Sequence, residues 1–459
     1  MRAGVGRPNI PVMESSERQR EYVLRTVEER GVRMIRLWFT DVLGQLKSFA
    51  ISPVELEGAF EEGMRFDGSS IDGFSRVQES DVLAKPDPNS FEILPWADGI
   101  GTSARVFCDI VNLDGTPFGG DPRQVLRRNL DKARERGFSF YAAPEMEFFY
   151  FADGDPSRPP RPLDQASYFD LTTADVATDL RQRTIHTLEA MGIPVEYSHH
   201  EDAPSQHEID LRYTDALTMA DSVMTFRLVV KEVALEAGVH ATFMPKPLTG
   251  VQGSGMHTHF SLFEGDTNAF YDPGDPLSLS KVARGFIAGL LRHAREITAV
   301  TNQWVNSYKR LVVGYEAPIY TSWARNNRSV IVNVPPIKHG KAESARLEFR
   351  APDAACNPYL AFSVCLAAGL KGIEEGYELD PETVTNLYQL TEQERIAEGI
   401  GMIPQSLSDA LDEMERSELV ADALGEHVFE WFIRNKRNEW LDYKTHVTQF
   451  ELDRYLARL

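Results

Sequence analysis

The sequence predicts an α+β fold with a sizeable antiparallel sheet in its larger, second part. Short apolar runs bounded by glycine and proline recur along the chain, and amphipathic helical stretches separate them in that second part. Its 459 residues, 42% hydrophobic and 25% charged, have the composition of a globular protein with enough chain for two domains. The order of the runs indicates a small, β-rich N-terminal domain followed by a mixed domain.

The N-terminal domain is predicted from three features. Residues 15–30 have the pattern of an amphipathic helix opened by a capping box, and residues 1–14 before it are expected to be flexible. Residues 32–52 form two apolar runs around Leu43-Gly44, which predicts a hairpin. Further short strands are expected at residues 91–96 and 105–111. We therefore place the first domain at residues 15–122 and the second at residues 123–459.

A helix start marks the predicted domain boundary. Residues 115–126 are rich in glycine and proline, and Asp121 followed by Pro122 is typical of a helix N-terminus. Beyond it, residues 220–238 and 279–298 have helical periodicity, and the last ~50 residues are also helical. Strands are predicted at residues 141–151, 194–201, 207–213, 241–247, 255–263 and 345–351.

Charge and cysteine content exclude several classes of function. The net charge of −21 argues against a nucleic-acid partner, because a surface that binds phosphates should be basic. No stretch approaches the roughly 20 apolar residues of a membrane span, so no membrane association is expected. Cys108, Cys356 and Cys365 follow no disulfide or metal spacing, which favours a cytoplasmic location. The chain contains neither a Walker motif nor a dinucleotide-binding glycine motif.

Six candidate metal ligands stand in four short, mostly apolar segments. Five carboxylates could converge in a core only if cations were present, because like charges that close together cannot all stay ionised. Oxygen ligands with a single imidazole favour Mg²⁺ or Mn²⁺ over zinc, and two such ions side by side are typical of phosphate chemistry. The candidates are Glu145, Glu147, Glu201, Glu208, His257 and Glu348.

Residue spacing supports convergence but leaves structural alternatives open. Side chains two apart on a strand share a face, which applies to Glu145 with Glu147 and to His257 with His259. The first pair could instead be a solvated strand face, and the histidines could be structural. The run Arg346, Glu348 and Arg350 could be an exposed ladder of ion pairs or a metal ligand between two anion clamps. Arg310 and Arg328 add two more cations in loop-like contexts. Five carboxylates together with these arginines indicate a site for a nucleotide phosphate held through divalent metals.

Eight segments stand in this order along the chain: FDGSSIDGF, PEMEFF, HHEDAPSQHEID, ATFMPKP, GSGMHTHFS, NSYKRLVVGYEAP, NNRS and RLEFRAPDAACNPYLA. In these segments, the chain from about residue 20 to the C-terminus resembles bacterial type I glutamine synthetase, and residues 424–432 (LGEHVFEWF) resemble its α-type subgroup. The resemblance implies an N-terminal β-grasp domain and a catalytic domain with a curved antiparallel sheet. It also implies a homo-oligomer, a dodecamer of two hexameric rings with active sites between subunits, and ATP-dependent ligation of ammonium to L-glutamate through γ-glutamyl phosphate.

The same resemblance implies a role for each site residue, with two or three Mg²⁺ or Mn²⁺ ions and ATP as co-substrate. A first metal would bind Glu147, Glu201 and Glu208, and a second Glu145, His257 and Glu348. Glutamate would be positioned by Gly253, Arg310 and Arg350; Arg328 and Arg346 would stabilise the transferring phosphoryl group; and His259 and Ser261 would border ATP. Ammonium would lose its proton to Asp67 of the neighbouring subunit, in a pocket completed by Ser70, Tyr168 and Glu201, and Glu316 would lie on a covering flap.

Two departures from the family pattern leave alternatives open. Gln252 replaces a usual asparagine in the glutamate loop, and Asn333 replaces a usual phosphate-facing arginine. One alternative is a γ-glutamylamine ligase that uses a polyamine or ethanolamine as the acceptor. Another is a weakly active homologue retained for regulation. Tyr388 resembles an adenylylated tyrosine of the other, β-type subgroup, and we expect it to be structural here.

Overall fold

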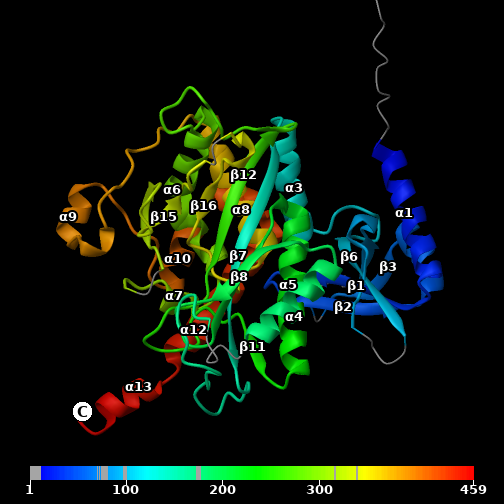
Figure 1. Cartoon of the computed structure of the whole chain (residues 1–459), viewed down its shortest axis with the longest axis horizontal. Helices are drawn as coiled ribbons and strands as arrows, with labels where there is room; N and C mark the ends of the chain where they lie inside the picture. The colour runs from blue at the N-terminus through cyan, green and yellow to red at the C-terminus, as the bar shows by residue number, and fades with distance from the viewer. Residues whose placement is uncertain are drawn as a thin grey trace, which may run out of the picture.

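The chain folds around two β-sheets joined through helix α3. The computed structural model describes residues 12–69, 71, 73, 81–96, 101–171, 177–314, 317–337 and 340–459, with side chains from residue 16 onward. Figure 1 places the smaller sheet, with β1 to β6, at one side of the molecule and the larger sheet at its centre. The predicted α+β fold is confirmed.

The N-terminal sheet has the order β2-β1-β6-β4-β3, with β5 paired to β6. Strands β1 and β6 run parallel and the other pairs are antiparallel. The predicted hairpin is confirmed, because β1 and β2 pair from Ile35 opposite Ile51 to Thr40 opposite Leu46. The elements are α1 (Val12–Glu29), β1 (Val32–Thr40), β2 (Leu46–Ile51), η1 (Pro53–Glu55), α2 (Leu56–Glu61), β3 (Met64–Asp67), β4 (Asp81–Pro86), η2 (Pro88–Ser90), β5 (Glu92–Ile93) and β6 (Thr102–Val111).

Helix α3 (Pro122–Glu135) begins where the sequence predicts. Asp121 caps it, because its carboxylate accepts hydrogen bonds from the backbone N–H of Arg123 (2.9 Å) and of Ile110 (2.8 Å) on β6. The first helix, by contrast, begins at Val12 and not at residue 15. The Asp121 side chain therefore satisfies the N-terminus of α3 and fixes α3 to the first sheet.

The larger sheet has the order β14-β15-β16-β12-β7-β9-β8, with β10, β11 and β13 as additional short pairs. It is antiparallel except for β14 and β15, which run parallel. The strand predicted at residues 241–247 extends only from His240 to Thr242, because the prolines that follow cannot donate to a ladder. The strands are β7 (Ser139–Phe151), β8 (Val195–His200), β9 (Gln206–Leu211), β10 (Thr214–Asp215), β11 (His240–Thr242), β12 (Met256–Glu264), β13 (Thr267–Asn268), β14 (Tyr320–Ala324), β15 (Val330–Asn333) and β16 (Leu347–Phe349).

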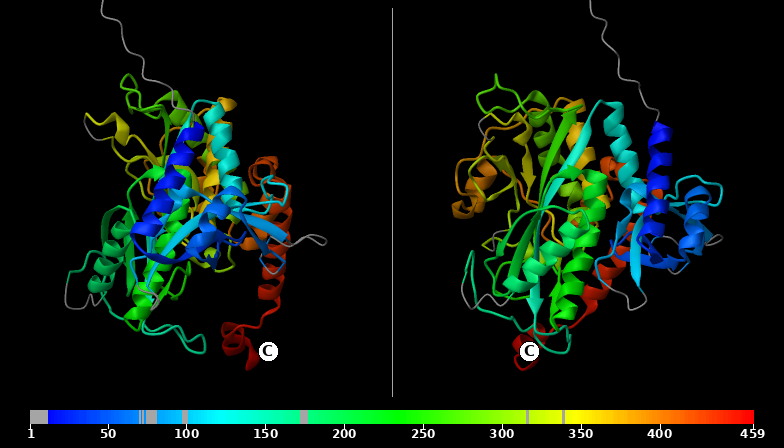
Figure 2. Two further views of the ribbon diagram at one scale, coloured as in Figure 1. Left: turned by 90° about the vertical axis from the view of Figure 1, so that its right-hand side faces the viewer. Right: turned by 45° about the vertical axis from the view of Figure 1, so that its right-hand side comes forward.

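Helices pack around this sheet, and the views in Figure 2 show α4 and α5 beside its lower part. Helices α6 and α8 approach closely through glycines; a Cβ atom on Gly289 would lie 2.1 Å from the carbonyl oxygen of Ala368. The helices are α4 (Thr178–Ala190), α5 (Ala216–Glu236), α6 (Lys281–Thr301), α7 (Ser307–Arg310), η3 (Ala342–Ser344), α8 (Pro358–Glu374), η4 (Leu387–Gln389), α9 (Glu392–Ala397), α10 (Leu407–Met414), α11 (Glu418–Leu424), α12 (Glu426–Thr445), α13 (Gln449–Glu451) and η5 (Leu452–Leu456). Among the described residues, no helix is long and apolar enough to cross a bilayer.

Candidate active site

An acidic pocket of about 250 Å³ lies on one face of the larger sheet. All six predicted metal ligands line it, together with five of the other residues singled out in the sequence and with both departures from the family pattern. The lining consists of Glu145, Glu147, Tyr168, Tyr197, Glu201, Asp202, Glu208, Gln252, Gly253, His257, Arg310, Arg328, Asn333, Glu348 and Arg350. Four segments that are far apart in the sequence therefore converge on one cavity.

Strand register produces this convergence. Glu147 on β7 lies opposite Glu208 on β9, and His257 on β12 lies opposite Glu145. On the other side of β12, His259 lies opposite Glu348 on β16. Because side chains two apart share a face, neighbouring strands place their carboxylates and imidazoles side by side.

The donor set fits divalent cations that prefer oxygen ligands. Glu145, His257 and Glu348 offer atoms within 4.8 Å of one another; the His257 Nδ1 atom lies 3.2 Å from Glu145 Oε2 and 3.8 Å from Glu348 Oε1. A second group, His199, Glu201 and Glu208, meets the same criterion. Carboxylate oxygens with few nitrogens suit Mg²⁺ or Mn²⁺.

The electrostatics also favour cations. Burial, followed by repulsion from Asp210 and Glu147, raises the pKa of Glu208 well above its ordinary value. Burial likewise raises the pKa of Glu147. Burial would raise the pKa of Glu145 too, but hydrogen bonds from His257 and His259 hold it well below its usual range. The pocket thus contains more negative charge than its own side chains neutralise.

Arg310, Arg350 and Gly253 line another part of the acidic pocket. Buried Arg310 donates to the carbonyl oxygens of Ala351 (2.9 Å) and Arg350 (3.3 Å), and Arg350 Nε donates to Glu348 Oε1 (2.9 Å). A Cβ atom at Gly253 would lie 2.1 Å from the Pro245 carbonyl oxygen, so the loop cannot carry a side chain there without moving. These contacts fix guanidinium groups beside the carboxylates, an arrangement that binds anions held through cations.

A second pocket of about 370 Å³ adjoins the first and shares Glu145, Tyr197 and Glu348 with it. It contains the predicted ATP-binding residues His259, Ser261 and Arg346. Its volume lies within the usual range for small-molecule sites. The shared glutamates place any phosphate that entered from this side next to the acidic pocket.

Both departures make contacts at the site. Asn333 Nδ2 donates to Glu348 Oε2 (2.7 Å), and Gln252 Nε2 donates to Asp202 Oδ2 (2.8 Å). Asn333 therefore orients Glu348, a candidate metal ligand, at a position where the usual arginine would have added a positive charge.

Sequence reasoning missed two buried polar residues. Gln206 Nε2 donates to Glu147 Oε2 (2.9 Å) and to the Gly253 carbonyl (3.1 Å). Asp210 lines the second pocket, and burial together with the charge of Glu145 raises its pKa from 3.8 to about 8. The two-residue spacing of Asp210 from Glu208 could have identified it.

Among the described residues, Asp67 is the one predicted site residue that lines neither pocket. Asp67 ends β3 in the N-terminal sheet, where its carboxylate accepts from Ser69 N–H (2.8 Å), and it does not line the acidic pocket of its own chain. Ser70 and Glu316 lie outside the described residues. An assignment of Asp67 to the site therefore requires a second subunit.

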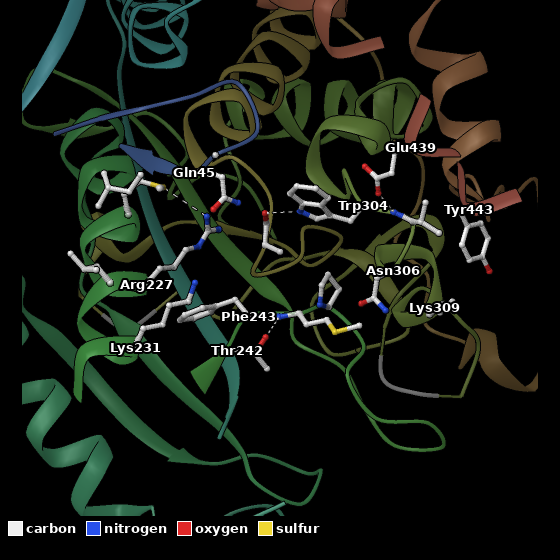
Figure 3. A pocket seen from close by; sticks show the side chains of 18 residues that line it. Gln45, Arg227, Lys231, Thr242, Phe243, Trp304, Asn306, Lys309, Glu439 and Tyr443 are labelled. Atoms are coloured by element: carbon white, nitrogen blue, oxygen red, sulfur yellow. Dashed lines mark hydrogen bonds between the residues drawn. The ribbon is translucent and has the colours of Figure 1, made fainter. Parts of the chain in front are cut away.

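A larger cavity of about 650 Å³ contains none of the predicted site residues (Figure 3). It lies between the β1–β2 turn, α5 and α12, and is lined by Gln45, Lys231, Trp304 and Tyr443 among others. Cavity volume alone would therefore select the wrong pocket. The convergence of carboxylates and arginines identifies the smaller pocket as the site.

Comparison with known families agrees with this geometry. The family described as "Glutamine synthetase, beta-Grasp domain" matches residues 31–113, and "Glutamine synthetase, catalytic domain" matches residues 119–455. The chain belongs to the glutamine synthetase family. This confirms the family resemblance and the predicted pairing of a β-grasp domain with a catalytic domain.

Relatives match over almost the whole chain. Glutamine synthetase of Mycolicibacterium smegmatis is 60% identical over 96% of this chain and 100% of the relative, and that of Thermotoga maritima is 49% identical over 95% and 99%. The solved structure described as GmaS in complex with ADP superposes with a TM-score of 0.86 at 32% identity, covering 95% of this chain and 99% of that one. The prediction of a ligase, and hence of an enzyme, is confirmed.

Proposed function

We propose that the chain ligates ammonium to L-glutamate at the expense of ATP, which yields glutamine, ADP and phosphate. One observation carries the proposal: a pocket of metal-binding carboxylates and arginines adjoins a nucleotide-sized pocket and shares Glu145 and Glu348 with it. The relatives named glutamine synthetase and the ADP complex of a structural neighbour support it.

The reaction divides into two balanced steps. The γ-carboxylate of glutamate attacks the γ-phosphorus of ATP, and the bond to ADP breaks, which gives γ-glutamyl phosphate. Ammonia then attacks the acyl carbon, phosphate leaves with its electron pair, and the attached nitrogen gives one proton to the departing phosphate, which leaves the amide of glutamine. Two or three Mg²⁺ or Mn²⁺ ions would supply the positive charge that brings the anionic reactants together. Glu147, Glu201 and Glu208 would hold one ion, and Glu145, His257 and Glu348 would hold another.

The chain's own residues bind and orient the reactants. Arg310 and Arg350, fixed beside Gly253, hold the carboxylates of glutamate. Arg328 and Arg346 stabilise the phosphoryl group from the two pockets, and His259 and Ser261 contact the nucleotide. Tyr168 and Glu201 form one side of the ammonium pocket.

The acceptor side needs a second subunit. Asp67 takes the proton from ammonium only if the N-terminal sheet of a neighbouring copy covers the pocket. Ser70 and Glu316, which the resemblance assigns to the same step, lie outside the described residues. This requirement supports a ring-shaped homo-oligomer, the predicted dodecamer of two hexameric rings. Asp67→Ala should then reduce ammonium use far more than ATP-dependent formation of the acyl phosphate. Equal losses in both steps would make Asp67 structural.

The first test is phosphate release by the purified chain with Mg-ATP and L-glutamate. Ammonium, putrescine, spermine and ethanolamine are compared as acceptors, and each product is identified by mass. We expect release with ammonium and a glutamine product. Release only with an amine, giving a γ-glutamylamide, would overturn the choice of acceptor and keep the acyl-phosphate step.

A further inference from the structure

Glu201 is placed differently from the other five candidate metal ligands. Those five lie on strands β7, β9, β12 and β16, where the ladder fixes the direction of each side chain. Glu201 follows the last residue of β8, and its backbone N–H donates to the Gln206 carbonyl across a turn (2.8 Å). Its carboxylate therefore depends on side-chain and loop contacts for its orientation.

His199 provides the main side-chain contact. Its Nε2 atom lies 2.9 Å from Glu201 Oε1, and the side chain is 5% exposed. The other oxygen, Oε2, accepts from the Asp202 N–H (2.9 Å). Because a carboxylate needs a donor, the Nε2 atom of His199 carries the proton and donates it. Both oxygens of Glu201 are thus held before any ligand binds.

Aromatic rings hold His199 in turn. The ring of Phe169 stacks on the imidazole with centroids 4.5 Å apart and an interplanar angle of 29°. Tyr197 stacks at 5.7 Å and 21°, and Tyr168 meets His199 edge-on at 5.3 Å. Within the described part of the chain, the Nδ1 atom of His199 is buried and has no hydrogen-bond partner. Ring packing is therefore what fixes the imidazole on that side.

The backbone of Phe169 is strained. Its φ is +61°, in the left-handed region that a bulky residue rarely adopts, although the residue is 58% exposed. Its N–H donates to the His200 carbonyl (3.1 Å), which keeps the ring over His199. Strain of this kind persists where surrounding contacts enforce it, and it clusters at functional sites.

We infer that His199, clamped by the rings of Phe169 and Tyr197, is a positioning residue that aims Glu201 at the cation in the acidic pocket. The register places His199 on β8 directly opposite Glu208, so the clamp lies beside the same group of donors. The inference rests on the proposed metal-dependent function. It assigns to Phe169 and His199 a role that the family resemblance did not supply.

The test is calorimetric titration of Mn²⁺ into the metal-stripped chain without substrates. We expect His199→Ala to raise the dissociation constant of one class of Mn²⁺ site about 10-fold or more, as loss of a residue that orients a ligand typically does. His199→Gln should restore most of the affinity, because its amide N–H can still donate to Glu201. His293→Ala is the matched control: it removes a buried histidine that pairs with Glu296 (3.0 Å) away from the pocket, and should leave the affinity unchanged.

Phe169→Gly separates positioning from folding. Glycine tolerates the positive φ, so the melting temperature should rise or hold, while the Mn²⁺ affinity should fall several-fold because the ring is lost. Ser278→Gly, at a second positive φ (57°) outside both pockets, should have no effect on Mn²⁺ binding.

The outcomes separate this inference from the proposed function. Unchanged Mn²⁺ affinity in His199→Ala, or equal losses in His199→Gln and His199→Ala, would overturn the positioning role even if the chain makes glutamine. If the expected losses occur but no glutamine forms, the inference stands and the proposed reaction falls. If the unmutated chain binds no Mn²⁺, both fall.

Discussion

The molecule buries charge in two regions, and the two are built in opposite ways. In the acidic pocket, Glu147, Glu201 and Glu208 crowd together, and burial with mutual repulsion raises the pKa of Glu208 well above its ordinary value. Near the start of α3, Arg123 is 3% exposed and is matched by acids from both domains.

The Arg123 cluster is internally neutralised. Its guanidinium donates to Asp87 (2.9 Å) directly after β4, to Asp109 (2.6 Å) of β6 and to Asp221 (2.8 Å) of α5. Burial would raise the pKa of Asp87, but Arg123 and Arg127 lower it below its ordinary value. A buried cluster that satisfies its own charges fastens structure together, whereas one with surplus charge of a single sign needs a ligand.

The largest expected effect is the loss of turnover when a candidate metal ligand is removed from the acidic pocket. Glu348→Ala should reduce turnover by about 10³-fold or more, since a lost metal removes several kcal/mol of transition-state stabilisation. Its melting temperature should fall by less than that of Arg123→Met, because relief of the repulsion from Glu145 partly offsets the loss of the hydrogen bonds from Arg350 and Asn333. The measurement pairs steady-state phosphate release with thermal unfolding, and Glu375→Ala, at an exposed pair with Lys371, is the control. Near-normal turnover would contradict the two-metal assignment.

Breaking the Arg123 cluster should lower the free energy of unfolding more than Glu348→Ala does. Arg123→Met removes the cation that Asp221 shares with Asp87 and Asp109, which keep only Arg127, and should cost about 3–5 kcal/mol of unfolding free energy, the scale for breaking a buried charge network. Urea unfolding measures it. Arg134→Ala on the same helix removes only an exposed pair with Asp131 and should cost below about 1 kcal/mol. A similar small loss for both variants would mean that the cluster does not fasten the domains.

Sequence reasoning predicted the acidic pocket better than the Arg123 cluster. Alternating residues on strands place Glu145 with Glu147 on one face, so period-two spacing indicated convergence, and the family resemblance then implied one set of roles. Arg123 was not singled out, because its partners come from β6, α5 and the residue after β4, and the sequence gives no local sign of that meeting.

Residues that act through another residue also escaped prediction. Gln206 and His199 orient Glu147 and Glu201. Each stands two residues from a candidate metal ligand, but that spacing alone does not single out a residue that acts through another. The parallel pairing of β14 with β15 was not expected either, since a strand pattern contains no information on direction. Sequence therefore predicted which groups meet better than what holds them in place.

Stabilisation by an added divalent cation should depend on the acidic pocket and not on the Arg123 cluster. A divalent ion at 100 times its dissociation constant should stabilise the unmutated chain by about 2.7 kcal/mol per site, because it binds the folded form. Thermal unfolding with and without Mn²⁺ measures this. Glu348→Ala should gain less, while Arg123→Met should keep the full gain although it starts from a lower stability. Equal gains in the unmutated chain and Glu348→Ala would place the ion elsewhere.

The smallest predicted effect concerns Asp210, whose pKa is raised by burial and by Glu145 from 3.8 to about 8. Because the folded form holds this proton more tightly than the unfolded form, the metal-free chain should lose stability as pH rises from about 4 to about 8. Asp210→Asn lacks this titration and should gain about 1–3 kcal/mol at pH 8, the scale of the desolvation penalty of a buried group, with no comparable gain at pH 4. Urea unfolding at the two pH values measures both. Mn²⁺ should reduce the gain, since a bound cation neutralises the charge that makes Asp210 costly. A gain of the same size at both pH values would mean that the substitution acts through packing and not through charge.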